Sequence, residues 1–389
     1  MTVFITDGLH RKSLAAVRSL GKKGISVTVG EKTRWNSSAF SKFCRRSFIY
    51  PDPEQAPDRF AEWFDTHVEK QRWDVFLPMD DAAVEIALHN RKKWETKCRL
   101  VLPPSESYWK ARDKYEAVQL AEKAGLAVPG TYIPQSLEEL RVKMIDLAFP
   151  VIIKPRKSSG SRGIQVVEQG KDLLEAYKRA ALQYERPMIQ EYIPQGDRFD
   201  VCLLFDQHHE MKSAFVQREI RHFPIPMGPS TVQESVIHDE LVEQSLRFMS
   251  KLPWYGVIEL EFMIDPRDGT AKFMEANPRF WNSLQCAIQA GIDFPYMLYE
   301  LAVRGDVQKQ CWYKEGIRCR NVLPGDVLHY VTNPDRFRMH PSFFSGKAKN
   351  VYDDILSVSD PLPALGFFLA CLRYSLQKEM WKKMFKRHL

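Results

Sequence analysis

Several common ligand-binding motifs are absent from this 389-residue sequence. It contains no Gly-x-x-x-x-Gly-Lys-Ser/Thr and no Gly-x-Gly-x-x-Gly, which excludes a P-loop and the dinucleotide-binding fingerprint. No helix-turn-helix, zinc-finger or aromatic RNA-binding signature occurs, so we expect no nucleic-acid partner. The formal net charge of +7 is modest and would favour small anionic ligands such as nucleotides.

Cysteine is scarce, and long apolar runs are missing. The seven cysteines are scattered, odd in number and never spaced as Cys-x-x-Cys, which is typical of free thiols in a reducing compartment. No charged segment followed by an apolar one opens the chain, so no export signal is indicated and a cytoplasmic location is expected. The longest apolar-leaning run, 362–372, is shorter than the ~20 residues that cross a bilayer.

The first third of the chain has the pattern of an α/β domain. Three apolar strands alternate with three helical segments. The strands lie at 3–6, 25–31 and 73–79, and the helices at 10–24, 54–71 and 80–95. This alternation predicts a small parallel sheet. The total length suits two or three domains.

Asp80 and Asp81 follow the third of these strands. Open α/β sheets bind ligands at the carboxyl ends of their strands, which would suit a substrate role. The same two residues begin a helix, where acids also cap for structural reasons. We expect one of them to cap the helix and leave a substrate role open for the other.

An acidic hairpin is the most informative feature. Residues 257–264 (VIELEFMI) and 271–276 read as strands, and DPRDG between them supplies a turn. If the loop has five residues, Glu261 lies directly opposite Glu275, with Cβ atoms ~4.5–5.5 Å apart on one face. Asn277, two residues beyond Glu275, points the same way.

Two carboxylates and an amide oxygen held this close would repel one another without a cation. Hard oxygen ligands on rigid strands suit Mg²⁺, with Mn²⁺ as an alternative, so Glu261, Glu275 and Asn277 are the predicted metal ligands. Glu259 shares their face and is the next candidate. Arg279 follows, with a planar fork that suits phosphate or carboxylate. The alternative is a charged hairpin facing water, which would not require Asn-Pro-Arg after its acids.

A second cluster lies upstream. The strand 149–154 ends in Lys154, and the small-residue loop KSSGSRG at 157–163 leads into another strand at 164–167. Such a loop can bring backbone N–H groups close to phosphate oxygens. A plain flexible hairpin would read in the same way. Further on, MIQEYIPQG at 188–196 reads as a strand leaving the core.

Taken in chain order, these segments resemble the ATP-grasp superfamily. The resemblance covers roughly residues 1–335, and ME-x-NPRF at 274–280 is its most specific part. It implies an α/β (α+β) chain with three parts: a Rossmann-like parallel-sheet domain, a small lid and a mixed-sheet ATP-binding domain. We expect these at 1–112 and 113–335, with the lid at about 150–190.

The resemblance also implies which residues bind ATP. The family's two phosphate-binding lysines match Lys114 and Lys154, and its Gly-rich hairpin matches Ser158 to Gly163. Many members carry a ribose-binding acid in a Gly-x-Glu pattern, which this chain lacks, so Asp197 or Asp200 would take its place. The implied nucleotide contacts are Lys114, Lys154, Ser158, Ser159, Gly160, Ser161, Gly163, Glu191, Ile193 and Asp197. The positions that match Glu261, Glu275 and Asn277 bridge the metals in that family.

Within the superfamily, the chain looks most like the carboxylate–amine or carboxylate–thiol ligases. The segment QREIRHFPIPMGPSTVQESV at 217–236 carries this likeness. It implies that Arg218 or Arg221 meets a substrate carboxylate, although a solvated strand edge would also explain these arginines. The catalytic set implied by the resemblance is Arg279, Lys154 and Arg218.

The activity implied is that of an ADP-forming ligase acting on small molecules. A substrate carboxylate would be activated by ATP as an acyl phosphate, and an amine would then displace phosphate. Two alternatives stay open: an acceptor that is a thiol or bicarbonate, or a nucleotide-binding protein without catalysis. The sequence indicates neither the identity of the substrates nor the oligomeric state.

The tail at 336–389 differs in character from the rest. We expect it to be helical, and 362–389 joins an apolar stretch to a basic end. A basic amphipathic helix can lie on a membrane surface, which would give the protein a peripheral membrane contact. The alternative is a terminal helix that packs on the protein, with its lysines favoured by the helix dipole.

Overall fold

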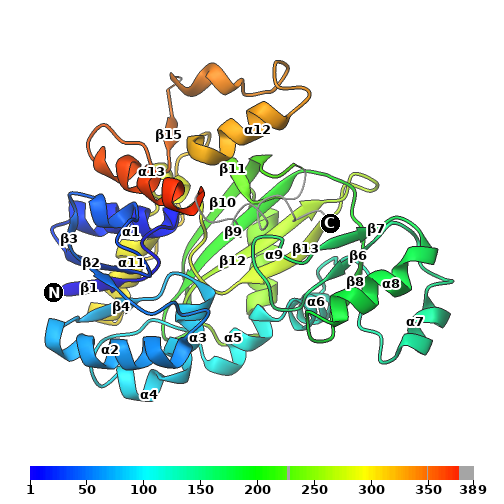
Figure 1. Cartoon of the computed structure of the whole chain (residues 1–389), viewed down its shortest axis with the longest axis horizontal. Helices are drawn as coiled ribbons and strands as arrows, with labels where there is room; N and C mark the ends of the chain where they lie inside the picture. Colours follow the sequence, from blue (N-terminus) through cyan, green and yellow to red (C-terminus); the bar gives the residue numbers. More distant parts are fainter. Residues whose placement is uncertain (226–227, 348, 376–389) are drawn as a thin grey trace.

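The computed structural model describes residues 1–225, 228–347 and 349–375. These residues form three β-sheets flanked by helices (Figure 1). The expected α/β class, with a parallel, a small and a mixed sheet, is confirmed.

The N-terminal sheet is parallel, with strand order β3-β2-β1-β4. Its strands are β1 (Thr2–Ile5), β2 (Ser26–Glu31), β3 (Cys44–Ile49) and β4 (Val75–Leu77). Its helices are α1 (Arg11–Lys22), α2 (Pro57–Gln71), α3 (Asp81–His89), α4 (Arg91–Trp94) and α5 (Ser105–Arg112), with a short 3₁₀ turn η1 (Ser38–Phe40). The sequence pattern missed β3, because its CRRSFI is an edge strand with mostly exposed side chains.

The lid contains a four-stranded antiparallel sheet of order β5-β8-β6-β7. Its elements are β5 (Thr131–Tyr132), α7 (Leu137–Lys143), β6 (Val151–Lys154), β7 (Gln165–Val167), α8 (Gly170–Ala181) and β8 (Met188–Glu191). A separate apolar cluster between the helices and the sheet makes the lid its own packing unit. Because β5 pairs with β8, the lid includes residues well before position 150.

The large sheet is mixed and has strand order β13-β12-β9-β10-β11-β14-β15. Its strands are β9 (Arg198–Phe205), β10 (Met211–His222), β11 (Ser230–Ser235), β12 (Gly256–Ile264), β13 (Ala271–Asn277), β14 (Arg318–Arg320) and β15 (Val351–Asp353). The remaining helices are α6 (Lys114–Lys123), α9 (Asp239–Met249), α10 (Leu284–Ala290), α11 (Phe294–Arg304) and α12 (Val327–Thr332), with the short turns η2 (Val322–Asp326) and η3 (Phe343–Lys347). Apolar side chains of α6 and α9 share a buried cluster with this sheet.

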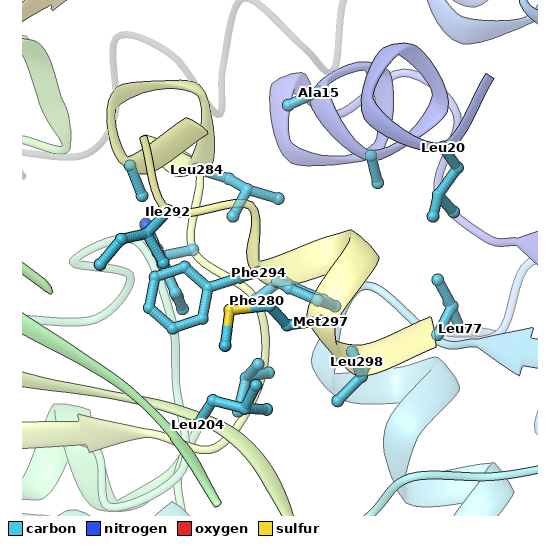
Figure 2. Close-up of a cluster of buried hydrophobic side chains, with 14 of the residues drawn as sticks. Ala15, Leu20, Leu77, Leu204, Phe280, Leu284, Ile292, Phe294, Met297 and Leu298 are labelled. Carbon is cyan, nitrogen blue, oxygen red and sulfur yellow. The ribbon is translucent and has the colours of Figure 1, made fainter. Parts of the chain in front are cut away.

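One apolar core joins the N-terminal sheet to the large sheet. Figure 2 shows Leu20 of α1 on one side of α11 and Leu204 of β9 on the other, with Leu77 of β4 close to Leu298 of α11. Phe294 and Met297 of α11 belong to the same cluster and are fully or nearly fully buried. These two parts therefore share a core, whereas the apolar cluster of the lid has no residue in common with it.

The segment after residue 335 runs back to the N-terminal sheet. Strand β15 adds to the edge of the large sheet beside β14, so the tail is not only helical. Asp360 then accepts hydrogen bonds from Arg18 Nε at 2.9 Å, Ser41 Oγ at 2.7 Å and Lys42 N at 2.9 Å. Both Arg18 and Asp360 are buried, so this contact fixes the tail to α1.

Helix α13 (Leu362–Ser375) follows and lies beside α1 in the view of Figure 1. It contacts η1, as expected for a terminal helix that packs on the protein. The rest of the predicted tail helix, 376–389, lies outside the described residues. No helix within the described residues is long and apolar enough to span a bilayer.

We expect Asp360→Ala to lower the free energy of unfolding by about 3 kcal/mol. Removing one partner of a buried ion pair costs ~3–5 kcal/mol, and Arg18 keeps three backbone carbonyl acceptors, which places the effect at the lower end. Urea unfolding measures this change. Asp335→Ala, at an exposed position, should change it by less than about 0.5 kcal/mol. Equal stabilities for the two variants would contradict the buried anchor.

Candidate functional site

The β12–β13 hairpin places the predicted acids face to face. Glu261 pairs with Glu275, and Glu259 pairs with Asn277, as the sequence predicted. The loop is not the five residues assumed, because residues 265–270 lie between the paired Ile264 and Ala271. A β-bulge at Met274 shifts the register by one residue and restores the predicted pairing.

Two lysines from different parts of the fold converge on Glu275. Lys114, the first residue of α6, places Nζ 2.7 Å from Glu275 Oε2. Lys154, at the end of lid strand β6, places Nζ 3.4 Å from the same oxygen. Both lysine side chains are about 95% buried. The structure thus brings together three residues that the sequence analysis predicted for one site.

These residues line a cavity between the lid and the large sheet. Of the predicted loop residues, Ser158, Ser159, Gly160 and Ser161 line it, and Gly163 does not. Gly163 instead supports the loop, since its φ is +77° and an added Cβ would lie 2.6 Å from the Tyr184 hydroxyl. The loop also contacts the N-terminal part, where Arg162 lies 3.5 Å from the exposed Glu54.

The hinge after β8 contributes some of the residues predicted for it. Ile193 lines the cavity, together with Gln190, Tyr192 and Gln195. Glu191 does not line it, because alternate residues of a strand point to opposite faces. Its carboxylate instead accepts from Gly130 N at 3.0 Å and from Arg267.

The predicted ribose acid Asp197 does not line the cavity, whereas Asp200 does. Asp200 is paired with Glu261 across β9 and β12, so both side chains share the cavity face. Gln217 donates to Asp200 at 2.7 Å. Of the two alternatives left open by the sequence, the structure therefore places Asp200 in the site.

Two charged cavity residues were missed by the sequence analysis: Arg198 of β9 and Glu219 of β10. They pair across the two strands, two residues along from the pair of Asp200 and Gln217. The signal was present as alternation, because Arg198 and Asp200 are two residues apart on one strand. Using this signal requires knowing that β9 lies next to β12, and the order of strands in a sheet cannot be predicted from the local sequence.

The acids that line this cavity have strongly shifted pKa values. Burial, together with the charge of Glu275, raises the pKa of Glu261 to about 8. Burial and the charge of Glu261 raise the pKa of Glu219 to about 8. Burial would also raise the pKa of Glu275, but Lys114 and Lys154 lower it well below its usual range. The cavity therefore holds more carboxyl groups than its two lysines neutralise.

Asn277 and Arg279 connect the acids to the N-terminal sheet. The Asn277 amide nitrogen donates to Glu259 at 3.1 Å and to Glu261 at 2.7 Å. Its amide oxygen accepts from Arg279 at 3.2 Å. The Arg279 Nε also donates to Asp81 at 3.1 Å and lies 3.4 Å from Asp80. Arg279 is thus engaged by protein groups on several sides, rather than aimed into the cavity.

The expectation that Asp80 or Asp81 caps α3 is wrong. Asp80 stands at the N-cap position, yet its side chain makes no capping hydrogen bond. It accepts from Lys12 Nζ at 2.8 Å, while Asp81 lies 3.2 Å from Arg112. Buried cations thus attract both carboxylates more strongly than the helix N–H groups do.

The predicted carboxylate-binding arginines lie away from the cavity. Arg218 points to the opposite face of β10, where it lies 3.1 Å from Glu234. Arg221 is buried against Asp326, with Nε 2.8 Å from Oδ1. Strand alternation gives the cavity face to Glu219 instead. Among the described residues, Arg198 is the arginine that lines this cavity.

As they lie in this structure, Glu261, Glu275 and Asn277 are only partly arranged to bind a cation. Across residues 1–225, 228–347 and 349–375, no three His, Cys, Asp or Glu side chains are arranged to hold a metal. Glu261 and Glu275 supply two opposed carboxylates, and Asn277 currently presents its nitrogen to the acids. A metal ion would require its amide oxygen there, so the predicted metal set remains a prediction.

Comparison with known proteins gives a consistent result. A sequence model of the carbamoyl-phosphate synthase L chain ATP-binding domain matches residues 113–307, which is half of the chain. Rat mitochondrial pyruvate carboxylase is 28% identical over 195 residues, covering 46% of this chain and 16% of that protein. The chain therefore corresponds to only a small part of such curated relatives.

Solved structures share the fold at low sequence identity. The biotin carboxylase domain of 2-oxoglutarate carboxylase from Hydrogenobacter thermophilus, solved with MgADP and bicarbonate, has a TM-score of 0.66 at 15% identity, covering 82% of this chain and 73% of that one. An L-amino acid ligase from Bacillus licheniformis has a TM-score of 0.59 at 17% identity, covering 77% and 73%.

We expect Gly196→Ala to distort the hinge and weaken adenine-nucleotide binding. An added Cβ would lie 1.9 Å from the Ile264 carbonyl oxygen, so either the hinge or the β12–β13 hairpin must move. This should lower the free energy of unfolding by ~1–3 kcal/mol. Urea unfolding and ADP titration measure both effects. Gly130→Ala is the matched control, because its nearest neighbour would be 3.8 Å away. Wild-type behaviour in both variants would contradict the close contact.

Proposed function

The chain belongs to the carbamoyl-phosphate synthase L chain ATP-binding domain family of the ATP-grasp superfamily, and on that premise we propose that it is an ATP-dependent, ADP-forming ligase. The observation that carries the proposal is the convergence of buried Lys114 and Lys154 on Glu275, opposite Glu261. Lysines from two parts of the fold, joined at one acidic hairpin, suit a nucleotide phosphate and its metal.

In this proposal, ATP lies in the cavity under the lid loop. Lys114 and Lys154 hold its phosphates, and backbone N–H groups of residues 158–161 approach the same oxygens. Ile193 and its hinge neighbours contact the adenine, while Asp200 takes the ribose role first assigned to Asp197. The small-residue loop would exclude water once the nucleotide is bound.

Mg²⁺, when bound, would neutralise phosphate charge during transfer. Glu261 and Glu275 would hold it, with Asn277 turned so that its amide oxygen faces the ion. That turn would break the hydrogen bond from Arg279 to the same oxygen, so Arg279 would position this segment through its contacts with Asp81 and the Phe280 carbonyl. Binding also requires Lys114 and Lys154 to shift from Glu275 toward the phosphates.

The chemical step we propose is acyl activation. A substrate carboxylate oxygen attacks the γ-phosphorus of ATP, and the bond to the bridging oxygen breaks, giving an acyl phosphate and ADP. An amine then attacks the acyl carbon, phosphate leaves with the C–O electron pair, and the amine loses a proton. Arg198 replaces Arg218 as the residue proposed to meet the substrate carboxylate, since it lines the cavity.

A second candidate uses bicarbonate as the group that ATP activates. Its support is the similarity to carboxylases, including the domain solved with MgADP and bicarbonate. The similarity to an L-amino acid ligase supports the amine reaction instead.

A cytoplasmic setting remains a prediction, based on the scattered cysteines, all seven of which are free thiols.

Trapping with hydroxylamine tests the reaction type. With ATP, Mg²⁺ and the correct carboxylate, we expect an acyl hydroxamate and stoichiometric ADP, found by screening carboxylate–amine pairs for ADP release. ADP release that requires only added bicarbonate would favour the second candidate. Phosphate found on a stable alcohol or amine product would show that the acyl-phosphate proposal is wrong.

We expect Glu275→Gln to lower Mg²⁺-dependent turnover by ~10²–10³-fold or more, because it deletes a unit charge from a site that stabilises transferring phosphate. Metal-free ADP should bind this variant more tightly than wild type, since both lysines lose their carboxylate partner. Activity assays and ADP titration in EDTA measure these two effects.

Glu259→Gln is the matched control for this variant. Burial and neighbouring acids raise the pKa of Glu259 well above its usual range, so Gln resembles its protonated form. Turnover should fall much less than in Glu275→Gln, and metal-free ADP affinity should not change. An equal loss in both variants, or near-normal turnover in Glu275→Gln, would contradict the assigned metal set.

A further inference from the structure

Helix α13 packs on the protein with its small side chains and exposes its large ones. Pro363, Gly366 and Ala370 are buried. An added Cβ on Gly366 would lie 2.7 Å from both Asn36 O and the Phe40 ring, so only glycine allows this close approach. The buried face of this helix therefore contributes little apolar area, unlike an ordinary amphipathic helix.

The opposite face carries a row of large apolar side chains, which we call the α13 ridge. Its members are Leu362, Leu365, Phe368 and Leu372, with exposed fractions of 54%, 49%, 61% and 50%. At ~100° per residue these positions fall within about 120° of one another on the helix, away from the small residues. A helix that is apolar on all sides is normally covered on all sides.

The charges around the ridge are positive. Arg373 is the only charged residue between 362 and 373. Arg373 donates to Thr33, and the next residue, Arg34, is exposed. At the other end of the helix, Asp360 accepts from Ser41 Oγ and from the backbone N–H of Lys42, whose side chain is exposed. The sequence 376–389, which lies outside the described residues, adds five Lys or Arg residues and one Glu.

We propose that helix α13 docks through its ridge on the surface of an anionic lipid bilayer. The ridge would lie at the boundary between headgroups and acyl chains, and the basic residues would contact anionic headgroups. A bilayer accepts a convex apolar ridge without a complementary groove. A second copy fits less well, because a symmetric dimer through the ridge would bring the two basic sequences together.

The contact between Asp360 and Arg18 also holds α13 in one orientation, which docking on a membrane surface requires. Asp360, directly before the helix, is held by buried Arg18, so α13 is fixed relative to the N-terminal sheet. The ridge therefore presents one orientation of the whole molecule to a flat surface. Because the proposal depends on no nucleotide residue, it stands or falls separately from the proposed ligase activity.

Co-sedimentation of the full chain with vesicles tests this. We expect binding to phosphatidylcholine vesicles containing about 30% phosphatidylserine, and little to pure phosphatidylcholine, since basic residues near an anionic surface add attraction. Leu365→Gln/Phe368→Gln should weaken binding by about ten-fold or more, because two large side chains lose their apolar environment. Lys382→Glu/Lys383→Glu should also weaken it, and high salt should mimic that effect.

Val142→Gln/Ile145→Gln is the matched control, because it removes two exposed apolar side chains from the lid. It should bind vesicles as wild type does, and thermal unfolding should show that all variants remain folded. Equal binding of the ridge variant and wild type would overturn the proposal, as would absence of binding to anionic vesicles. So would a dimer in sedimentation velocity that the ridge variant abolishes, since a second copy would then cover the ridge.

Discussion

The opposition of Glu261 and Glu275 is the constraint on which the rest of the site depends. Two half-buried carboxylates on neighbouring strands repel each other unless cations lie close by, and the fold supplies such cations from two directions. Lys114 comes from the helix before the lid, and Lys154 from a strand within it. Glu275 thereby links the hairpin, α6 and the lid through its two lysine partners. Any nucleotide that enters competes with this carboxylate for the lysines, so binding and rearrangement are coupled.

The sequence was sufficient for the acidic hairpin, because its signals are local. Alternation, a Pro/Asp/Gly turn and ME-x-NPRF lie within about 25 residues and predict which side chains share a face. Even there, the pairing of Glu261 with Glu275 depends on the bulge at Met274, since a one-residue slip would turn Glu275 to the other face. No residue type in that strand predicts the bulge. The correct pairing was therefore predicted from a loop length that the structure does not have.

Residues that were misplaced belong to contacts between distant segments. Arg218 and Glu219 are adjacent, and only the position of β10 beside β9 decides which one faces the cavity. The sequence could not decide between Asp197 and Asp200 as the cavity residue, because the pairing of Asp200 with Glu261 joins strands that are distant in the chain. Arg279 looked available for a ligand, because its partner Asp81 is almost 200 positions away. The tail was read as a helix alone, since the pairing of β15 with β14 is not a local property.

The contact between Arg18 and Asp360 has a consequence for how the protein is made. During synthesis, α1 emerges early, yet its buried arginine has no carboxylate partner until more than 340 further residues have followed. At ~5–20 residues per second, the N-terminal sheet waits tens of seconds for the group that neutralises it. The packing of α1 therefore cannot be completed as a separate domain, because it depends on a segment more than 340 residues further along the chain.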